Sequence, residues 1–158
     1  MLTINFTKSK LPYGWMGNMS PYPIKFGDET YRTTEALFQA LRFSDNDIKE
    51  LIKAEKSPMG AKFVAKSRVD QMTIKQLSDA DVDNMRLCVR LKVIQYPNLL
   101  KELLETGDVL IVEDVTNRGD KGSNTFWGAM LVGEEWIGQN ILGKIWMQVR
   151  KEYQKVAI

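Results

Sequence analysis

The chain has 158 residues, of which 44% are hydrophobic and 27% are charged, a size and composition typical of one globular domain with a hydrophobic core. Its 22 basic and 20 acidic residues leave a net charge of +2, which is too balanced to predict a general nucleic-acid-binding or membrane-binding surface. The chain has one cysteine and no histidine. This excludes an intrachain disulfide, histidine-dependent nucleophilic catalysis, histidine-bound metals and zinc–cysteine sites.

Any chemistry therefore has to rest on carboxylates, amides, lysine, arginine and aromatic rings. The sequence contains neither a P-loop nor a dinucleotide-binding glycine fingerprint, and we expect no metal and no cofactor. No apolar run has the length of a membrane span, and the first residues lack the pattern of a signal peptide. With the single cysteine, these features predict a cytoplasmic protein that does not bind a membrane.

Hydrophobic periodicity and turn residues predict a single α+β domain over residues 1–158. In chain order, the predicted elements are a strand at 2–6, a turn-rich segment at 10–22, a hairpin of strands at 23–26 and 30–33, helices at 33–43, 47–56, from 57, at 78–96 and at 98–106, a strand at 109–112, a loop at 117–124 and a last helix from 140. The predicted N-caps of these helices are Thr33 or Thr34, Ser57, Asn98 and Asn140, and Ser78 opens the helix predicted at 78–96.

The helix predicted at 33–43 carries the most informative pattern. At about 100° per residue, its apolar side chains cover roughly two thirds of the circumference. Only Glu35, Gln39 and Arg42, spaced i, i+4 and i+7, interrupt them and form one narrow polar seam. A helix this apolar is normally buried, and buried polar groups need partners or a cavity. The seam predicts an active-site wall, and the alternative is a polar strip open to bulk water.

Glu35 is the candidate reactive group of this seam. It lies in the first turn, where the helix dipole favours the ionised carboxylate, whereas apolar neighbours would raise its pKa. The sequence leaves open which effect dominates. The carboxylate could stabilise a cationic, sugar-like transition state or activate water, and Gln39 and Arg42 could orient hydroxyl or phosphate groups.

Two further patterns lie near the end of the chain. The segment Asn124–Gly128 places two aromatic rings beside a glycine, which suits a platform for a flat base; the alternative is that Trp127 buries the end of a strand. Gly138 allows close backbone approach, and the helix that starts at Asn140 offers free N–H groups to an anion. An ordinary capped helix start is the alternative there.

Lys92 interrupts an apolar sector of the helix predicted at 78–96. It projects between Met85 and Cys88. A lysine in this position commonly extends its amine to solvent, and the alternative is an amine that meets a phosphate or carboxylate.

Taken in order, these pieces resemble the NADAR (YbiA-like) family, and the resemblance covers nearly the whole chain. The matching segments are Gly17-Asn18 ahead of Pro23-Ile24, Thr34 to Phe43, Ser57-Pro58-Met59-x-Ala61, Met85 to Lys92, Leu103-Leu104-x-Thr106-Gly107, Leu110-x-x-Glu113, Phe126-Trp127-Gly128 and Gly138-x-Asn140-x-Leu142-Gly143, ending at Met147 and Arg150.

The resemblance implies a mostly helical α+β domain with a small β-sheet or hairpin, whose pocket accepts ribose-phosphate or ADP-ribose-like ligands. It also implies hydrolysis of an N-glycosidic bond, either in ribosylamine pyrimidine intermediates of riboflavin synthesis or between ADP-ribose and guanine. The expected substrate is then a small ribosyl or ADP-ribosyl molecule, with ADP-ribosylated nucleic acid as a further partner. The family's helix glutamate falls on Glu35, its tryptophan on Trp127, and two asparagines on Asn18 and Asn140.

The chain departs from the family pattern at two positions. Many members have lysine where this chain has Arg42, and a guanidinium cannot form a Schiff base as an amine can. Many members have aspartate where this chain has Asn124, whose amide can bond ribose but cannot act as a base.

Three hypotheses follow from the sequence. The first is an N-glycosidase with Glu35 and Trp127 as catalytic residues. Its substrate would be held by Asn18, Gln39, Arg42, Lys92, Asn124, Gly128 and Asn140. The second is a module that binds ADP-ribose or another nucleotide without turnover, which Arg42 and Asn124 favour. The third is an interaction protein in which the seam is purely structural.

Overall fold

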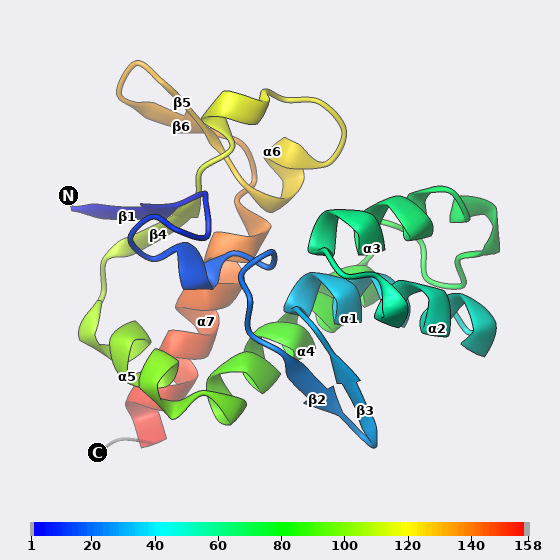
Figure 1. The fold of residues 1–158 in the computed structure, drawn as a ribbon. Helices are drawn as coiled ribbons and strands as arrows, with labels where there is room; N and C mark the ends of the chain where they lie inside the picture. Colours follow the sequence, from blue (N-terminus) through cyan, green and yellow to red (C-terminus); the bar gives the residue numbers. More distant parts are fainter. Residues whose placement is uncertain (1, 157–158) are drawn as a thin grey trace. The chain divides into compact units, whose positions relative to one another are not determined.

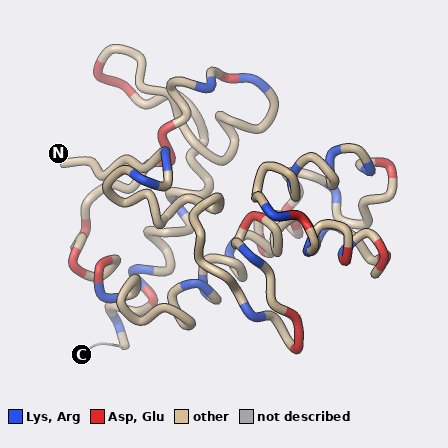
Figure 2. Tube along the Cα trace, in the orientation of Figure 1, with Lys and Arg blue, Asp and Glu red and all other residues tan. Residues whose placement is uncertain are grey.

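The computed structural model describes residues 2–156, which fall into two compact units. Residues 18–95 form the first, here called the central unit, and residues 2–17 with 96–156 form the second, here called the split unit. Figure 2 shows basic and acidic residues interspersed along the chain of each unit. Within residues 2–156, no helix combines the length and the apolar character needed to cross a membrane.

The central unit consists of one hairpin and four α-helices (Figure 1). Its elements are β2 (Ile24–Phe26), β3 (Glu29–Tyr31), α1 (Thr34–Leu41), α2 (Asn46–Ala54), α3 (Pro58–Lys66), the short 3-10 helix η2 (Val69–Gln71) and α4 (Asp79–Gln95). The two strands are antiparallel, as predicted for this hairpin. Helix α1 packs against α2, α3 and α4, so it supplies the middle of the core of this unit.

The predicted capping residues explain where two of these helices begin. The Thr33 hydroxyl accepts a hydrogen bond from the Ala36 amide at 3.1 Å, and the Ser57 hydroxyl accepts one from the Gly60 amide at 2.9 Å. Both N-caps are confirmed. Helix α2 begins one residue earlier than predicted because the Asp45 carboxylate caps it.

The split unit combines residues 2–17 with residues 96–156. Its elements are β1 (Thr3–Phe6), the 3-10 helix η1 (Gly14–Met16), α5 (Pro97–Glu105), β4 (Leu110–Glu113), the 3-10 helix η3 (Thr116–Arg118), α6 (Asn124–Trp127), β5 (Met130–Val132), β6 (Glu135–Ile137) and α7 (Ile141–Val156). Strands β1 and β4 are parallel, and β5 and β6 form an antiparallel hairpin. Helix α7 packs on β4 and α5.

Two tryptophans fill the core of the split unit. The Trp146 ring is fully buried and meets the Trp15 ring edge-on, with centroids 5.3 Å apart. Its indole N–H donates to the Met16 carbonyl at 3.0 Å, so the largest apolar side chain of α7 also has its polar atom bonded.

The structure confirms the α+β class and corrects three local predictions. Asn98 does not cap α5: the helix begins at Pro97 with Tyr96 as N-cap, because proline suits the first helical position. The predicted loop at 117–124 ends in a short helix, α6, that begins at Asn124. The β5–β6 hairpin was not predicted.

Candidate functional site

The seam of α1 faces the buried side of α4. Glu35, Gln39 and Arg42 are 7%, 4% and 5% exposed, so the alternative of a strip open to water is wrong. Helix α1 packs against α4, whose buried residues include Asp81 and Met85. Polar groups that are buried in this way need partners, and the seam finds them on α4 and within α1.

Burial decides the direction of the Glu35 pKa, which the sequence left open. The loss of solvent raises the pKa of Glu35 above its ordinary value of 4.5. The charge of Lys62 on α3, the hydrogen bond from Gln39 and the charge of Arg42 lower it, and the charge of Asp81 raises it.

A chain of hydrogen bonds runs along the seam from α4 to Glu35. The Arg42 guanidinium donates to both carboxylate oxygens of Asp81, from Nε at 2.9 Å and from Nη2 at 2.7 Å. Its Nη1 donates to Gln39 Oε1 at 3.2 Å, and Gln39 Nε2 donates to Glu35 Oε1 at 3.4 Å. The guanidinium also lies 4.5 Å from the centre of the Phe38 ring.

Asp81 is the seam partner that sequence reasoning missed, and it is fully buried. In sequence it looks like one of the solvated acidic residues in the first turn of α4. The signal was its spacing: Asp81 precedes Met85, Cys88 and Lys92 by i+4, i+7 and i+11, and so belongs to their helix face. The structure gives Arg42 this carboxylate as partner, where a phosphate or a substrate hydroxyl was expected.

Asn18 lies at the start of the seam helix, in the central unit. Its carbonyl accepts hydrogen bonds from the Glu35 amide at 3.0 Å and from the Thr34 hydroxyl at 3.1 Å. Its side-chain amide lies 3.1 Å from the Met85 sulfur. The two hydrogen bonds to its carbonyl hold the Asn18 backbone against the first turn of α1, and its side-chain amide faces Met85 on α4.

Lys92 does not extend to solvent. It is 1% exposed, and its amine donates to the Ser20 hydroxyl at 2.7 Å and lies 5.2 Å from the centre of the Tyr22 ring. Burial lowers the pKa of Lys92 from 10.5 to about 7. The expected extension to water is wrong, because Ser20 and Tyr22 cover the amine. Burial also raises the pKa of the neighbouring Cys88 thiol, which stays protonated.

In the split unit, Trp127 ends the short helix α6. Its ring is 9% exposed and meets the Phe126 ring edge-on at 4.9 Å between centroids. The Asn124 amide donates to the carbonyls of Arg118 and Gly119 at 3.3 and 3.1 Å. Asn124 therefore holds the loop that leads into α6.

Gly128 lets the chain pass close to the end of β4. A Cβ at this position would lie 2.5 Å from the Glu113 carbonyl oxygen and 2.7 Å from a methyl carbon of Val115. The Ala129 amide then donates to the Glu113 carbonyl at 2.9 Å. The close approach that glycine permits is thus made to β4.

The Asn140 side chain bonds to β4 and not to the helix that it precedes. Its backbone has φ 53°, in the left-handed region that asparagine tolerates. Its Oδ1 accepts from the Glu113 amide at 3.0 Å, and its Nδ2 donates to the Ile111 carbonyl at 2.9 Å. The prediction that this side chain caps α7 is wrong, because the left-handed turn accompanies a side chain bonded to the strand.

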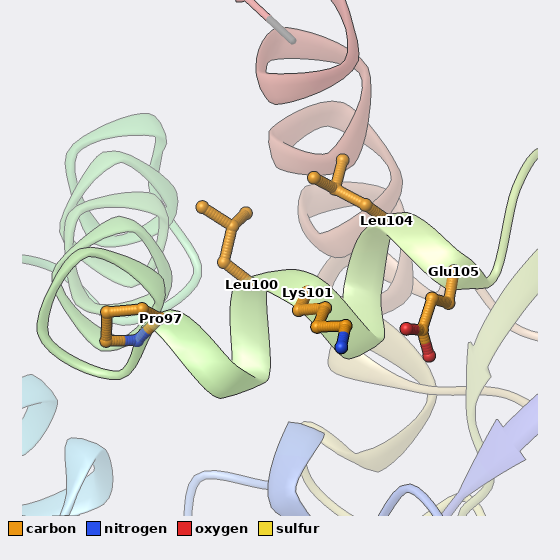
Figure 3. Close-up of a pocket in the computed structure, with 5 residues that line it drawn as sticks. All are labelled: Pro97, Leu100, Lys101, Leu104 and Glu105. Atoms are coloured by element: carbon orange, nitrogen blue, oxygen red, sulfur yellow. The ribbon is translucent and has the colours of Figure 1, made fainter.

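Two surface hollows are lined by other residues than those predicted for the site. One, of about 420 Å³, lies along α5 (Figure 3) and is lined by Pro97, Leu100, Lys101, Leu104 and Glu105. The other, of about 430 Å³, belongs to the central unit and is lined by Phe26, Glu29, Tyr31, Ala40, Leu41, Asn46, Lys49 and Glu50. Across residues 2–156, no group of three or more acidic or cysteine side chains is arranged to hold a metal ion.

Known proteins match this chain over nearly its whole length. A protein of Nostoc punctiforme named as an N-glycosidase is 32% identical over 158 residues, which cover 98% of this chain and 95% of that protein. N-glycosidase YbiA of Escherichia coli K12 is 31% identical over 149 residues, 94% of this chain and 87% of that protein. The maize riboflavin biosynthesis protein PYRR, chloroplastic, is 31% identical, and the match covers 25% of its length.

The solved structures and the family patterns agree with these matches. The NMR structure of E. coli YbiA superposes with a TM-score of 0.81 at 30% identity, covering 98% of this chain and 86% of that one. The pattern that defines the NADAR domain matches residues 5–154. The chain belongs to the NADAR domain family.

Proposed function

We propose that this chain is an N-glycosidase that hydrolyses the bond between a nitrogen and the anomeric carbon of a ribose. The observation that carries the proposal is Glu35, a carboxyl group that is buried in the seam of α1 and has a raised pKa. Carboxyl groups whose pKa is shifted by burial and by specific neighbours are concentrated at functional sites. The proposal is supported by the matched relatives that are named N-glycosidase.

The reaction places positive charge next to this carboxylate. The bond from the anomeric carbon to nitrogen breaks, the nitrogen leaves with its electron pair and takes a proton, and water adds its oxygen to the carbon. The sugar passes through an oxocarbenium-like state. In its ionised form Glu35 would stabilise that cation or take the proton of the attacking water, and a dry setting strengthens the attraction.

We propose a ribosylamine intermediate of riboflavin synthesis or an ADP-ribosylated guanine as substrate. The first is supported by matched proteins named as riboflavin biosynthesis proteins, from maize and from Vibrio vulnificus. The match to the NADAR pattern over residues 5–154 supports the proposal that one functional domain spans the whole chain.

The other site residues keep proposed roles that fit their contacts. In the central unit, Gln39 would position a ribose hydroxyl, because its amide bonds to the Glu35 carboxylate. Asn18 would do the same from the backbone beside Glu35, where its carbonyl accepts from the Glu35 amide. Arg42 would act through Gln39, to which it bonds. Lys92 would hold a phosphate only if a ligand displaced Ser20 and Tyr22, which cover its amine. In the split unit, Trp127 would stack on a base, and the other three residues, Asn124, Gly128 and Asn140, would shape the backbone near it.

The direct test is Glu35→Gln, which keeps the size and hydrogen bonding of the side chain and removes its charge. We expect the rate of base release to fall by about 10²- to 10⁴-fold. Chromatography measures this rate with ribosylamine intermediates and with ADP-ribosylated guanine as substrates. Glu50→Gln is the matched control, since Glu50 is a largely exposed glutamate on α2 that pairs with Lys53. Full activity of Glu35→Gln would exclude Glu35 as the catalytic carboxylate.

The alternative is a module that binds ADP-ribose or a related nucleotide without turnover. The engagement of the Asn124 amide with two loop carbonyls favours it, because this side chain is then neither a base nor free to move. Calorimetry with ADP-ribose beside the product assay separates the two functions. Tight binding with no released base after long incubation would support the module and contradict the enzyme.

A further inference from the structure

The Asp81 carboxylate accepts three hydrogen bonds. It takes two hydrogen bonds from the Arg42 guanidinium, and its Oδ2 also accepts from the Leu77 amide at 2.9 Å. Leu77 has φ 64°, a left-handed conformation that is strained for leucine. The left-handed turn at Leu77 thus points a backbone amide at this carboxylate, which adds a third hydrogen bond to the two from Arg42.

The guanidinium then fixes the orientation of the Gln39 amide. A guanidinium has only donors, so the atom of Gln39 that faces Arg42 Nη1 is the acceptor Oε1. The donor Nε2 is consequently the atom that faces Glu35. Asp81 holds Arg42, and Arg42 orients the Gln39 amide. Because of this orientation, Glu35 faces the NH₂ group of Gln39 and not its oxygen.

Asp81 also determines the position of the Arg42 guanidinium and hence of its positive charge. Both the Nε and Nη2 atoms of Arg42 are directed at Asp81, and the seam offers Glu35 the neutral amide of Gln39 between itself and that cation. A carboxylate paired directly with a guanidinium would be neutralised, and it could no longer stabilise a cationic sugar.

We propose that Asp81 is a positioning residue of the Glu35 site: it holds Arg42 away from Glu35 and, through Arg42, aims the Gln39 amide at the Glu35 carboxylate. This inference rests on the proposed function, since it assigns the seam to the reaction of Glu35. Neither a matched name nor the sequence pattern gives Asp81 a role.

The proposal makes the pKa of Glu35 depend on Asp81 with a definite sign. Charged and titratable groups reach Glu35 from α3 (Lys62), from the C-cap of α1 (Arg42) and from α4 (Asp81 and the Cys88 thiol). On β3 and α2, Glu29 and Glu50 bond to Lys53 in a separate cluster.

Loss of the Asp81 charge would lower the pKa of Glu35 in two ways. It removes a negative neighbour, and it frees Arg42 to turn towards Glu35. Loss of the Gln39 donor would act in the opposite direction and raise the pKa of Glu35.

The experiment measures the Glu35 carboxyl pKa directly, by NMR titration of the protein labelled with ¹³C at the glutamate carboxyl carbons. We expect a lower pKa than wild type in Asp81→Asn and a higher one in Gln39→Leu. Where base release is measurable, we expect kcat of Asp81→Asn to fall about 10- to 100-fold, as for a misplaced catalytic group, with a smaller change in KM. The acidic limb of the pH profile should move with the NMR value, which a purely structural role would not produce.

Two further variants keep the test decisive. Asp81→Leu with Arg42→Met replaces the buried pair by apolar side chains, an exchange that commonly preserves folding, and it covers the case in which Asp81→Asn does not fold. We expect it to raise the pKa of Glu35, because it removes the Arg42 cation and the hydrogen bond by which Arg42 aims the Gln39 donor at Glu35. Asp83→Asn is the control: Asp83 is an exposed aspartate of α4 that pairs with Arg86 at 2.8 Å, and it should leave Glu35 unchanged.

The outcomes separate this inference from the proposed function. A Glu35 pKa that is the same as wild type in the Asp81 variants overturns the positioning role, whatever the activity. The expected pKa shifts in a protein that releases no base from any substrate would support the role of Asp81 and contradict the glycosidase.

Discussion

The ionised form of Glu35, which the proposed chemistry requires, lowers the stability of the folded protein. Its carboxyl group has a higher pKa in the folded protein than in the unfolded chain, since burial disfavours the ionised form. Below the unfolded value, near 4.5, both states hold the proton and the cost vanishes. As the pH rises from there through the folded value, the unfolded chain releases its proton more easily, and folding stability falls.

Replacing Glu35 with glutamine should therefore stabilise the protein at neutral pH while it removes activity. We expect a higher melting temperature for Glu35→Gln at pH 7 to 8 and little difference near pH 4. Each kcal/mol gained corresponds to about 2–4 °C for a chain of this size. Thermal unfolding followed by circular dichroism across this pH range measures the effect, and a variant that is less stable than wild type at pH 8 would contradict it.

Lys92 has the opposite dependence on pH. Its pKa is lowered to about 7 in the folded protein by burial, so the cost of burying the ammonium is fully present below pH 7. It is relieved as the pH rises from about 7 towards the unfolded value of 10.5, because only the unfolded chain then still holds the proton.

A Lys92→Met variant should be more stable than wild type at pH 6 and should lose this advantage towards pH 10. Each unit of difference in pKa corresponds to about 1.4 kcal/mol. Urea unfolding at several pH values gives the comparison. A constant difference between the two proteins at all pH values would mean that Lys92 does not change its proton affinity on folding.

At the scale of single residues, the sequence predicts that the helix at 33–43 carries a polar seam, but it does not predict which residues contact that seam. The spacing of Glu35, Gln39 and Arg42 follows from helix geometry alone and is readable from the letters. The identity of their partner depends on how α1 and α4 cross, which is a tertiary contact. Asp81 was consequently missed, and the direction of the Glu35 pKa could not be derived until its burial was known.

At the scale of elements, one side chain joins the start of α7 to β4. Asn140 bonds to the backbone on both sides of Val112, at the Ile111 carbonyl and the Glu113 amide. The neighbouring Gly143 admits this contact, since a Cβ there would lie 2.3 Å from the Ile111 carbonyl oxygen. The helix and the strand are therefore joined by backbone-directed bonds as well as by apolar packing.

Substitutions at Asn140 should separate the effects of side chain and backbone. Asn140→Gly removes both hydrogen bonds and keeps the left-handed φ, with an expected loss of about 1–3 kcal/mol. Asn140→Ala adds the strain of a Cβ in that conformation, about 1–2 kcal/mol more. Urea unfolding provides both numbers, and equal stability of the two variants would mean that the left-handed backbone is not maintained.

The elements that could be predicted are those with a strong period or a capping residue. Helices α1 and α3 have both, and the hairpin of β2 and β3 has its turn at Gly27. Helix α6 is a single turn of four residues, too short to show a helical period. The missed strands β5 and β6 carry exposed apolar residues, Leu131, Val132 and Ile137, so no alternation of buried apolar and exposed polar residues marks them. They are held by contacts such as the Glu113 carbonyl to the Ala129 amide, which local sequence does not encode.

For the whole molecule, the α+β class and the family follow from the order of motifs along the chain. The class was readable because helical and strand periods are both present in one sequence, and the ordered motifs led to the family that the comparisons show. The absence of histidine limited the candidate catalytic residues more than any motif did, because a chain without histidine has few groups able to transfer a proton. Substrate choice depends on a bound ligand's shape and stays a proposal.

The parallel pairing of β1 with β4 has a consequence for how this protein folds during synthesis. Thr3 pairs with Leu110, and all of residues 18–95 lie between these strands in the chain. During synthesis the first strand leaves the ribosome long before its partner exists, whereas the helices of the central unit find their neighbours nearby in sequence. Long loops close slowly and leave strand edges exposed meanwhile. Until β4 has been made, β1 therefore has an unpaired edge that a chaperone or a wrong strand can bind.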